Sequence, residues 1–110
     1  MLNAKQKQAL LKNWGEKADA LECLAEVRFY DPTSTWECYI YALNPQDEDE
    51  CDCIVKVSHQ QRATIERWFL SNIALVFNRD GESVQIDEDY RPRVASEILK
   101  KLNENIIYDR

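Results

Sequence analysis

Apolar and polar residues alternate through three consecutive runs near the middle of the chain, which is the pattern of β-strands with one buried face. The runs cover residues 25–30, 35–43 and 51–57. Pro32 and Pro45 lie in the two connections between them. Because both connections are short, we expect three neighbouring antiparallel strands.

The second run differs from the first because neither of its faces is plainly polar. One face carries Trp36, Cys38, Ile40 and Ala42, and the other carries Glu37, Tyr39, Tyr41 and Leu43. We therefore expect both faces of this strand to be at least partly covered. In the third run, Asp52 and Lys56 are expected to point away from the core, on the same side as Ile54.

Helical spacing appears at both ends of the chain. Asn3 is a suitable N-cap for a helix over residues 4–13 that ends before Gly15, and a short helical stretch over residues 16–23 is expected next. The last helix is predicted to begin near Pro92 and to pack onto the sheet. Its apolar positions are Ala95, Ile98, Leu99, Leu102 and Ile106.

Between the third strand and the last helix, the sequence predicts one helix and two more strands. Ser58 and Gln61 have the spacing of a capping box, so a helix is expected there. Its buried stripe would contain Ile65, Trp68 and Phe69. Residues 73–77 and 83–86 are expected to be strands joined by a turn at residues 79–82.

The predicted order α-β-β-β-α-β-β-α defines a single two-layer α+β domain over residues 1–110, with an antiparallel sheet of about five strands. The length suits one domain with its own core. The first residues lack the apolar segment of a signal peptide, so a cytoplasmic protein with no membrane partner is expected. In a reducing compartment the four cysteines are expected to be free, buried thiols.

The net charge of −6 argues against direct binding of nucleic acid, because affinity for phosphates depends on lysine and arginine. Two groups of carboxylates are the densest charges on the chain. The first contains Asp47, Glu48, Asp49 and Glu50, followed by Asp52, and the second contains Asp87, Glu88 and Asp89. Three alternatives are open for them: a solvated loop, a divalent-cation site, or an electronegative surface for a basic partner.

Tyr39 and Tyr41 also have two possible roles. With Tyr30 from the neighbouring strand, they would form either an aromatic binding face or a core face covered by a helix. Catalysis is not expected, because His59 is the single histidine and the two glycines cannot form a phosphate-binding loop. We expect no catalytic residue, no cofactor and no bound metal.

Three segments carry motifs that can be compared with known families. They are Leu10-Leu11-Lys12-Asn13, then residues 27–32 with Thr35-Trp36 and residues 43–47, and finally Ile86 to Tyr90 with Pro92. They resemble the opening helix, the central block and the closing motif of a small bacterial domain family of unknown function, carried on plasmids, integrative elements and phages. The chain departs from the family at Cys53-Ile54, where phenylalanine-glycine is usual, and at Glu88, where arginine is usual. The resemblance implies a mobile-element context and supplies no catalytic residue.

Charge and resemblance together predict a non-enzymatic, acidic inhibitor encoded by a mobile element, acting as a monomer or homodimer. Its expected partner is a basic surface on a host nuclease or on a nucleic-acid-guided defence complex, an anti-defence role of the anti-CRISPR kind. One alternative is an immunity or antitoxin-like protein that neutralises a cognate toxin. Another is a domain that binds a small molecule or a cation.

Overall fold

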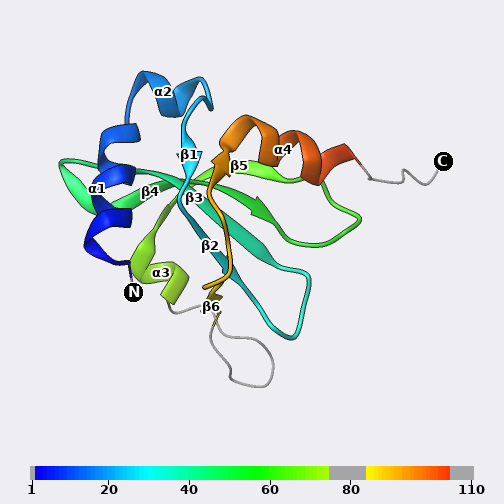
Figure 1. Ribbon diagram of the computed structural model, residues 1–110. Coiled ribbons are helices and arrows are strands. Elements are labelled where there is room, and N and C mark those ends of the chain that lie inside the picture. Colours follow the sequence, from blue (N-terminus) through cyan, green and yellow to red (C-terminus); the bar gives the residue numbers. More distant parts are fainter. Residues whose placement is uncertain (1, 75–83, 105–110) are drawn as a thin grey trace.

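A computed structural model describes residues 2–74 and 84–104 of the chain (Figure 1). Its elements are α1 (Ala4–Asn13), α2 (Glu16–Asp19), β1 (Leu24–Ala25), β2 (Val27–Tyr30), β3 (Glu37–Asn44), β4 (Asp47–Lys56), β5 (Thr64–Phe69), α3 (Leu70–Ala74), β6 (Gln85–Ile86), β7 (Arg93–Val94) and α4 (Ala95–Glu104). Five strands form an antiparallel sheet in the order β5-β4-β3-β2-β6, and β1 pairs with β7 in a separate ribbon. The predicted α+β class with a five-stranded antiparallel sheet is confirmed.

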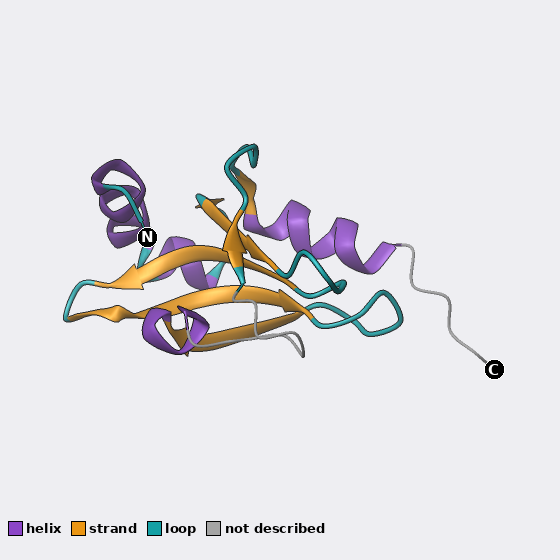
Figure 2. Ribbon diagram, turned by 90° about the horizontal axis from the view of Figure 1, so that it is seen from below, coloured by secondary structure: helices purple, strands orange, loops and turns teal. Residues whose placement is uncertain are grey.

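The sheet has a hydrophobic cluster on each face. On one face, Leu10 of α1 and Leu70 and Ile73 of α3 pack against apolar residues of β2, β3 and β4. On the other face, α2, the β1–β7 ribbon and α4 cover the sheet, with Ala95 and Ile98 of α4 buried. Figure 2 shows α4 lying along one side of the strands. The prediction that both faces of β3 are covered is therefore confirmed.

A bulge in β3 changes which residues share a face. Ile40 pairs with Cys53 of β4 and Ala42 pairs with Asp52, so Tyr41 is an extra residue on β3. The inserted residue reverses the alternation after Ile40. Leu43 consequently joins the cluster of Ile40, whereas Ala42 joins that of Tyr41, and the face predicted for each by simple alternation was wrong.

The N-terminal segment follows the prediction closely. Asn3 and Gln6 form a reciprocal capping box in which each side chain accepts from the other's backbone amide, at 2.8 and 3.0 Å. Gly15 adopts a φ of 106°, a conformation that a side chain disfavours, and it separates α1 from α2. Helix α2 ends at Asp19 and is therefore shorter than the stretch predicted over residues 16–23.

The predicted first strand is divided at Glu26. Its first part, β1, pairs with β7, while its second part, β2, pairs with β3 and β6. Residues Arg93 and Val94 belong to this β1–β7 ribbon, so α4 begins at Ala95 and not near Pro92. Ile106, which was assigned to the same helix, lies outside the described residues.

The helix predicted after Ser58 was wrong. Residues from Thr64 to Phe69 form β5, which pairs with β4 along six residues, from Val55 opposite Thr64 to Glu50 opposite Phe69. This strand lies at the edge of the sheet, and Ile65 is 51% exposed rather than buried. Trp68 lies on the opposite face of the sheet from Ile65. There it stacks on Trp36, with 6.1 Å between the ring centroids.

The segment that follows β5 also differs from the prediction. Ile73 was expected to begin a strand, but it lies in the short helix α3 and is buried against the sheet. Residues 75–77 of that predicted strand and the turn at residues 79–82 lie outside the described residues. The next predicted strand is present as β6, which pairs with β2 through Phe29 opposite Ile86.

Candidate functional site

The first acidic cluster lies in a strand and not in a loop. Only Pro45 and Gln46 form the turn between β3 and β4, because Asn44 already pairs with Asp47. The Asn44 side-chain oxygen accepts from the Gln46 amide at 2.9 Å and stabilises this turn. The prediction that the carboxylates of residues 47–50 form a connection was therefore wrong: they belong to β4.

Contacts within the protein engage three carboxylates of this first cluster. Glu48 lies 3.5 Å from the Lys7 ammonium of α1. Asp49 accepts from both the amide and the hydroxyl of Ser71, at 2.9 and 2.6 Å. Glu50 lies 3.5 Å from the Arg67 guanidinium. These carboxylates stabilise the contacts of β4 with α1, β5 and α3, so they are only partly available to a partner.

Asp52 is enclosed, although its position in the sequence predicted that it points away from the core. It is 7% exposed and accepts from Arg67 at 2.8 and 3.4 Å. The Arg67 guanidinium in turn lies 4.6 Å from the centroid of the Trp14 ring. Asp52 therefore forms an ion pair with Arg67, whose side chain is 55% exposed, beside Trp14 at the end of α1.

The second acidic cluster combines one internally bound carboxylate with two that are exposed. Asp87 accepts from Arg28 at 2.8 Å, and Arg28 also donates to Glu37 at 3.1 Å. Asp89 donates its amide to Asp87 at 3.0 Å. Glu88 and Asp89 are exposed, and no ion pair to either is present within residues 2–74 and 84–104.

Two hollows adjoin Glu88. One, of about 590 Å³, extends towards Tyr30, Gln85 and Asp89. The other, of about 300 Å³, extends towards Glu26, towards the N-cap Asn3 and towards Gln6 of α1. Among the described residues that line them there is no lysine or arginine. Both hollows are therefore electronegative.

The two acidic clusters lie on separate parts of the surface. They belong to β4 and to the segment after β6, and β3 and β2 lie between those strands. At about 4.8 Å per strand, β4 and β6 are roughly 14 Å apart. Helix α1 extends between them, because its Lys7 contacts Glu48 while its Gln6 lines the hollow beside Glu88 (Figure 1).

The tyrosines of β3 form a covered core face and not an exposed binding face. Tyr41 is 2% exposed and Tyr39 is 9% exposed, beneath α4 and the β1–β7 ribbon. Burial raises the pKa of both phenols above the ordinary range. Of the two roles predicted for Tyr39 and Tyr41, the structure therefore supports the role in the core. Tyr30 is less enclosed, with the Arg28 guanidinium 5.1 Å from its ring centroid.

The cysteines are free and buried, as predicted. Cys38, Cys51 and Cys53 belong to one hydrophobic cluster, and Cys23 belongs to the cluster on the opposite face. Hydrogen bonding to Cys53, together with burial, raises the pKa of Cys51. Hydrogen bonding to Cys38, together with burial, raises that of Cys53. Neutral thiols of this kind are core groups and poor nucleophiles.

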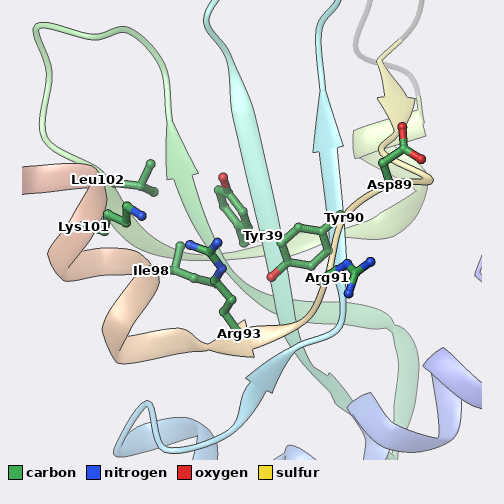
Figure 3. Close-up of a pocket in the computed structure, with 8 residues that line it drawn as sticks. All are labelled: Tyr39, Asp89, Tyr90, Arg91, Arg93, Ile98, Lys101 and Leu102. Atoms are coloured by element: carbon green, nitrogen blue, oxygen red, sulfur yellow. The ribbon is translucent and has the colours of Figure 1, made fainter.

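The structure also contains a basic pocket that the sequence analysis missed (Figure 3). It has a volume of about 370 Å³ and lies between β3, the segment before β7, and α4. Its cationic lining residues are Arg91, Arg93 and Lys101, and its apolar walls include Tyr39, Tyr90 and Ile98. The signal in the sequence is Tyr90-Arg91-Pro92-Arg93, an aromatic and basic run directly after the acidic cluster.

The described chain is thus an α+β domain with exposed carboxylates beside two hollows and with an adjoining basic pocket. No helix among its described residues has the length and apolar character needed to cross a membrane. Comparisons with protein-family models, curated proteins and solved structures found no match to this chain. The resemblance to the plasmid and phage family consequently stays a prediction.

Proposed function

We propose that this protein is a non-enzymatic inhibitor that binds a basic surface of a host nuclease or of a nucleic-acid-guided defence complex. The observation that carries the proposal is the position of Glu88 between two hollows whose described lining contains no cation. A lysine or arginine of the partner would enter such a hollow and meet Glu88 with either Asp89 or Glu26. The overall charge of −6 also favours a positively charged partner.

Competition with nucleic acid follows from the chemistry of these groups. Carboxylates at matching positions bind the same arginines and lysines that a basic surface uses to bind phosphates. Arginines that are occupied in this way are no longer available to the nucleic acid. Long-range attraction between opposite charges would accelerate the encounter. Burial of these ion pairs beneath the bound partner would matter for affinity, because fully exposed pairs contribute little.

The cluster around Glu88 is the better candidate for direct contact. Glu48, Asp49 and Glu50 already bind groups of this protein, so a partner would have to compete with those contacts. Their negative charge still adds to the long-range field. We therefore expect the first cluster to affect the association rate and the second to affect the lifetime of the complex.

Two double variants test this assignment. Glu88→Gln with Asp89→Asn, and Asp47→Asn with Glu48→Gln, each remove two negative charges and leave the same net charge. Basic nucleases and guide-complex subunits that bind the tagged protein are purified, and affinity is measured at several salt concentrations together with nuclease activity. We expect the first variant to lose at least about tenfold in affinity and to lose inhibition. The second variant should retain inhibition.

Equal effects of the two double variants would show that only net charge matters and would overturn the assignment to Glu88. Binding without any inhibition would overturn the inhibitor role. Protection against one cognate toxin, with no effect on host nucleases, would instead identify the immunity-like alternative.

A further inference from the structure

We propose that the pocket between β3, β7 and α4 binds a small organic anion that carries a phosphate monoester on a planar group. The ligand has the opposite charge to the partner proposed above. The pocket shares only Asp89 with the hollow of about 590 Å³ beside Glu88, and only Tyr90 with the hollow of about 300 Å³. The inference therefore concerns a second site.

The cationic groups of this pocket are available to a ligand. No salt bridge involving Arg91, Arg93 or Lys101 occurs within the described part of the chain. Figure 3 shows the Arg93 and Lys101 side chains directed into the space beside Tyr39, while Asp89 projects away from it. Cations gathered in a hollow without a carboxylate facing them attract an anion, even on a protein whose net charge is −6.

The remaining walls suit a planar or apolar group. Tyr39 and Tyr90 meet edge to face with their centroids 5.6 Å apart. The Tyr90 hydroxyl donates to the Ala25 carbonyl at 2.8 Å, and the Tyr39 hydroxyl donates to Glu37. Both rings are thus fixed before any ligand arrives, which lowers the entropy cost of binding.

The pocket is held open by contacts at both ends of α4. At its start, the amides of Ala95 and Ser96 donate to the carbonyls of Cys23 and Leu21, at 2.9 and 3.0 Å. Near its end, the buried ammonium of Lys56 donates to the Leu102 carbonyl at 3.1 Å. The helix therefore cannot close onto the tyrosines without losing these bonds.

Size and charge together select the ligand class. A volume of about 370 Å³ falls at the lower end of the range for small-molecule sites, roughly 300–1,000 Å³. A phosphate monoester carries close to two negative charges at neutral pH and offers several acceptor oxygens, which suits a pair formed by an arginine and a lysine. Nucleoside monophosphates combine that group with a planar base, so they are the probes of choice.

The test is titration calorimetry of the full chain with the monophosphates of adenosine, guanosine, cytidine and uridine. Inorganic phosphate and the uncharged nucleosides are titrated separately. We expect saturable binding of at least one monophosphate, weakened about tenfold or more when either the phosphate or the nucleoside is presented alone. Arg93→Gln and Lys101→Gln should each weaken binding by about tenfold.

Lys100→Gln is the matched control, because it removes the same charge from the neighbouring position of α4 and Lys100 does not line the pocket. Its affinity should equal that of the unaltered protein. Lack of saturable binding by all four monophosphates would overturn the proposal. So would an equal loss in Lys100→Gln, since it would show a nonspecific charge effect. The experiment contains no basic partner, so its outcome leaves the role of Glu88 to the nuclease assay.

Discussion

The side-chain nitrogen of Asn13 lies 2.9 Å from the carbonyl oxygen of Tyr41, the residue that the bulge inserts into β3. The same nitrogen donates to the Leu24 carbonyl at 3.1 Å. One amide at the end of α1 thus joins the helix to β3 and to β1. A bulge interrupts the regular ladder of backbone hydrogen bonds. The Asn13 side chain therefore helps to satisfy the hydrogen-bonding capacity of the Tyr41 carbonyl.

Asn13→Ala should lower the free energy of unfolding by about 1–3 kcal/mol, because the partly buried Tyr41 carbonyl then keeps only the weak Cys23 thiol donor at 3.5 Å. Asn13→Asp should be at least as damaging, since a carboxylate would face two carbonyl oxygens. Lys12→Ala, at an exposed position of the same helix, is the control. Urea unfolding of the three variants measures the difference. If Asn13→Ala and Lys12→Ala agreed within about 0.5 kcal/mol, the bond to Tyr41 would contribute no stability.

Lys56 provides a second test, which concerns how the face of the sheet beneath α4 is assembled. It is 4% exposed, and its ammonium donates to the Gln61 and Leu102 carbonyls at 2.6 and 3.1 Å. Leu102 lies in the last turn of α4, where the helix dipole also favours a positive charge. This lysine therefore connects β4, the loop before β5, and α4.

Lys56→Met keeps the length and apolar stem of the side chain but removes its donors. We expect a loss of about 1–3 kcal/mol in the free energy of unfolding. Lys100→Met makes the same substitution at an exposed position of α4 and should change it by less than about 0.5 kcal/mol. Thermal unfolding compares them. A Lys56→Met protein as stable as the control would show that the two hydrogen bonds only replace equally good bonds to water.

Local patterns in the sequence predicted the elements whose stability is local. The capping box of Asn3 and Gln6 is such a case, because both partners lie within one turn. The alternation likewise identified β2, in which Val27 and Phe29 are buried, although it did not show that the predicted strand is divided at Glu26. The spacing of Ser58 and Gln61 imitated a capping box, but the residues after it complete the ladder of β4, and that pairing is not local. Tertiary context therefore decided the outcome.

The candidate site was predictable only in part for the same reason. The carboxylates were visible as composition, but their partners lie far away in the sequence, as in the pairs of Glu48 with Lys7 and of Asp49 with Ser71. The basic pocket brings Tyr39 of β3 next to Tyr90 and Lys101. Its assembly depends on the β1–β7 ribbon, whose two-residue strands are too short to give a sequence pattern.

The thiols supply a test of the core. Hydrogen bonding and burial raise the pKa values of Cys51 and Cys53, so both should remain protonated and unreactive in the folded protein. Iodoacetamide at mildly alkaline pH, followed by mass spectrometry, should label neither residue until urea unfolds the chain. Glutathione in the same tube is the reference for an accessible thiol. Labelling of native Cys51 at a rate near that of glutathione would contradict the buried arrangement.

The buried tyrosines predict a loss of stability at alkaline pH. Burial raises the pKa of Tyr90 from the ordinary value of 10 to about 12, against the opposing charge of Arg93. The unfolded chain therefore ionises first. The stability that this phenol contributes is complete below pH 10 and is lost as the pH rises through 12. Tyr39 and Tyr41, whose pKa values are also raised by burial, act with the same sign.

Tyr90→Phe isolates the contribution of one phenol to that alkaline loss. Near neutral pH the variant should be less stable by about 1 kcal/mol, because the hydrogen bond to Ala25 is absent. Between pH 10 and 12 its free energy of unfolding should fall less steeply than that of the unaltered protein, since one ionising group has been removed. Urea unfolding at a series of pH values measures both slopes. Identical slopes would mean that Tyr90 titrates alike in the folded and unfolded chains, and so that the pocket wall it forms is open to water.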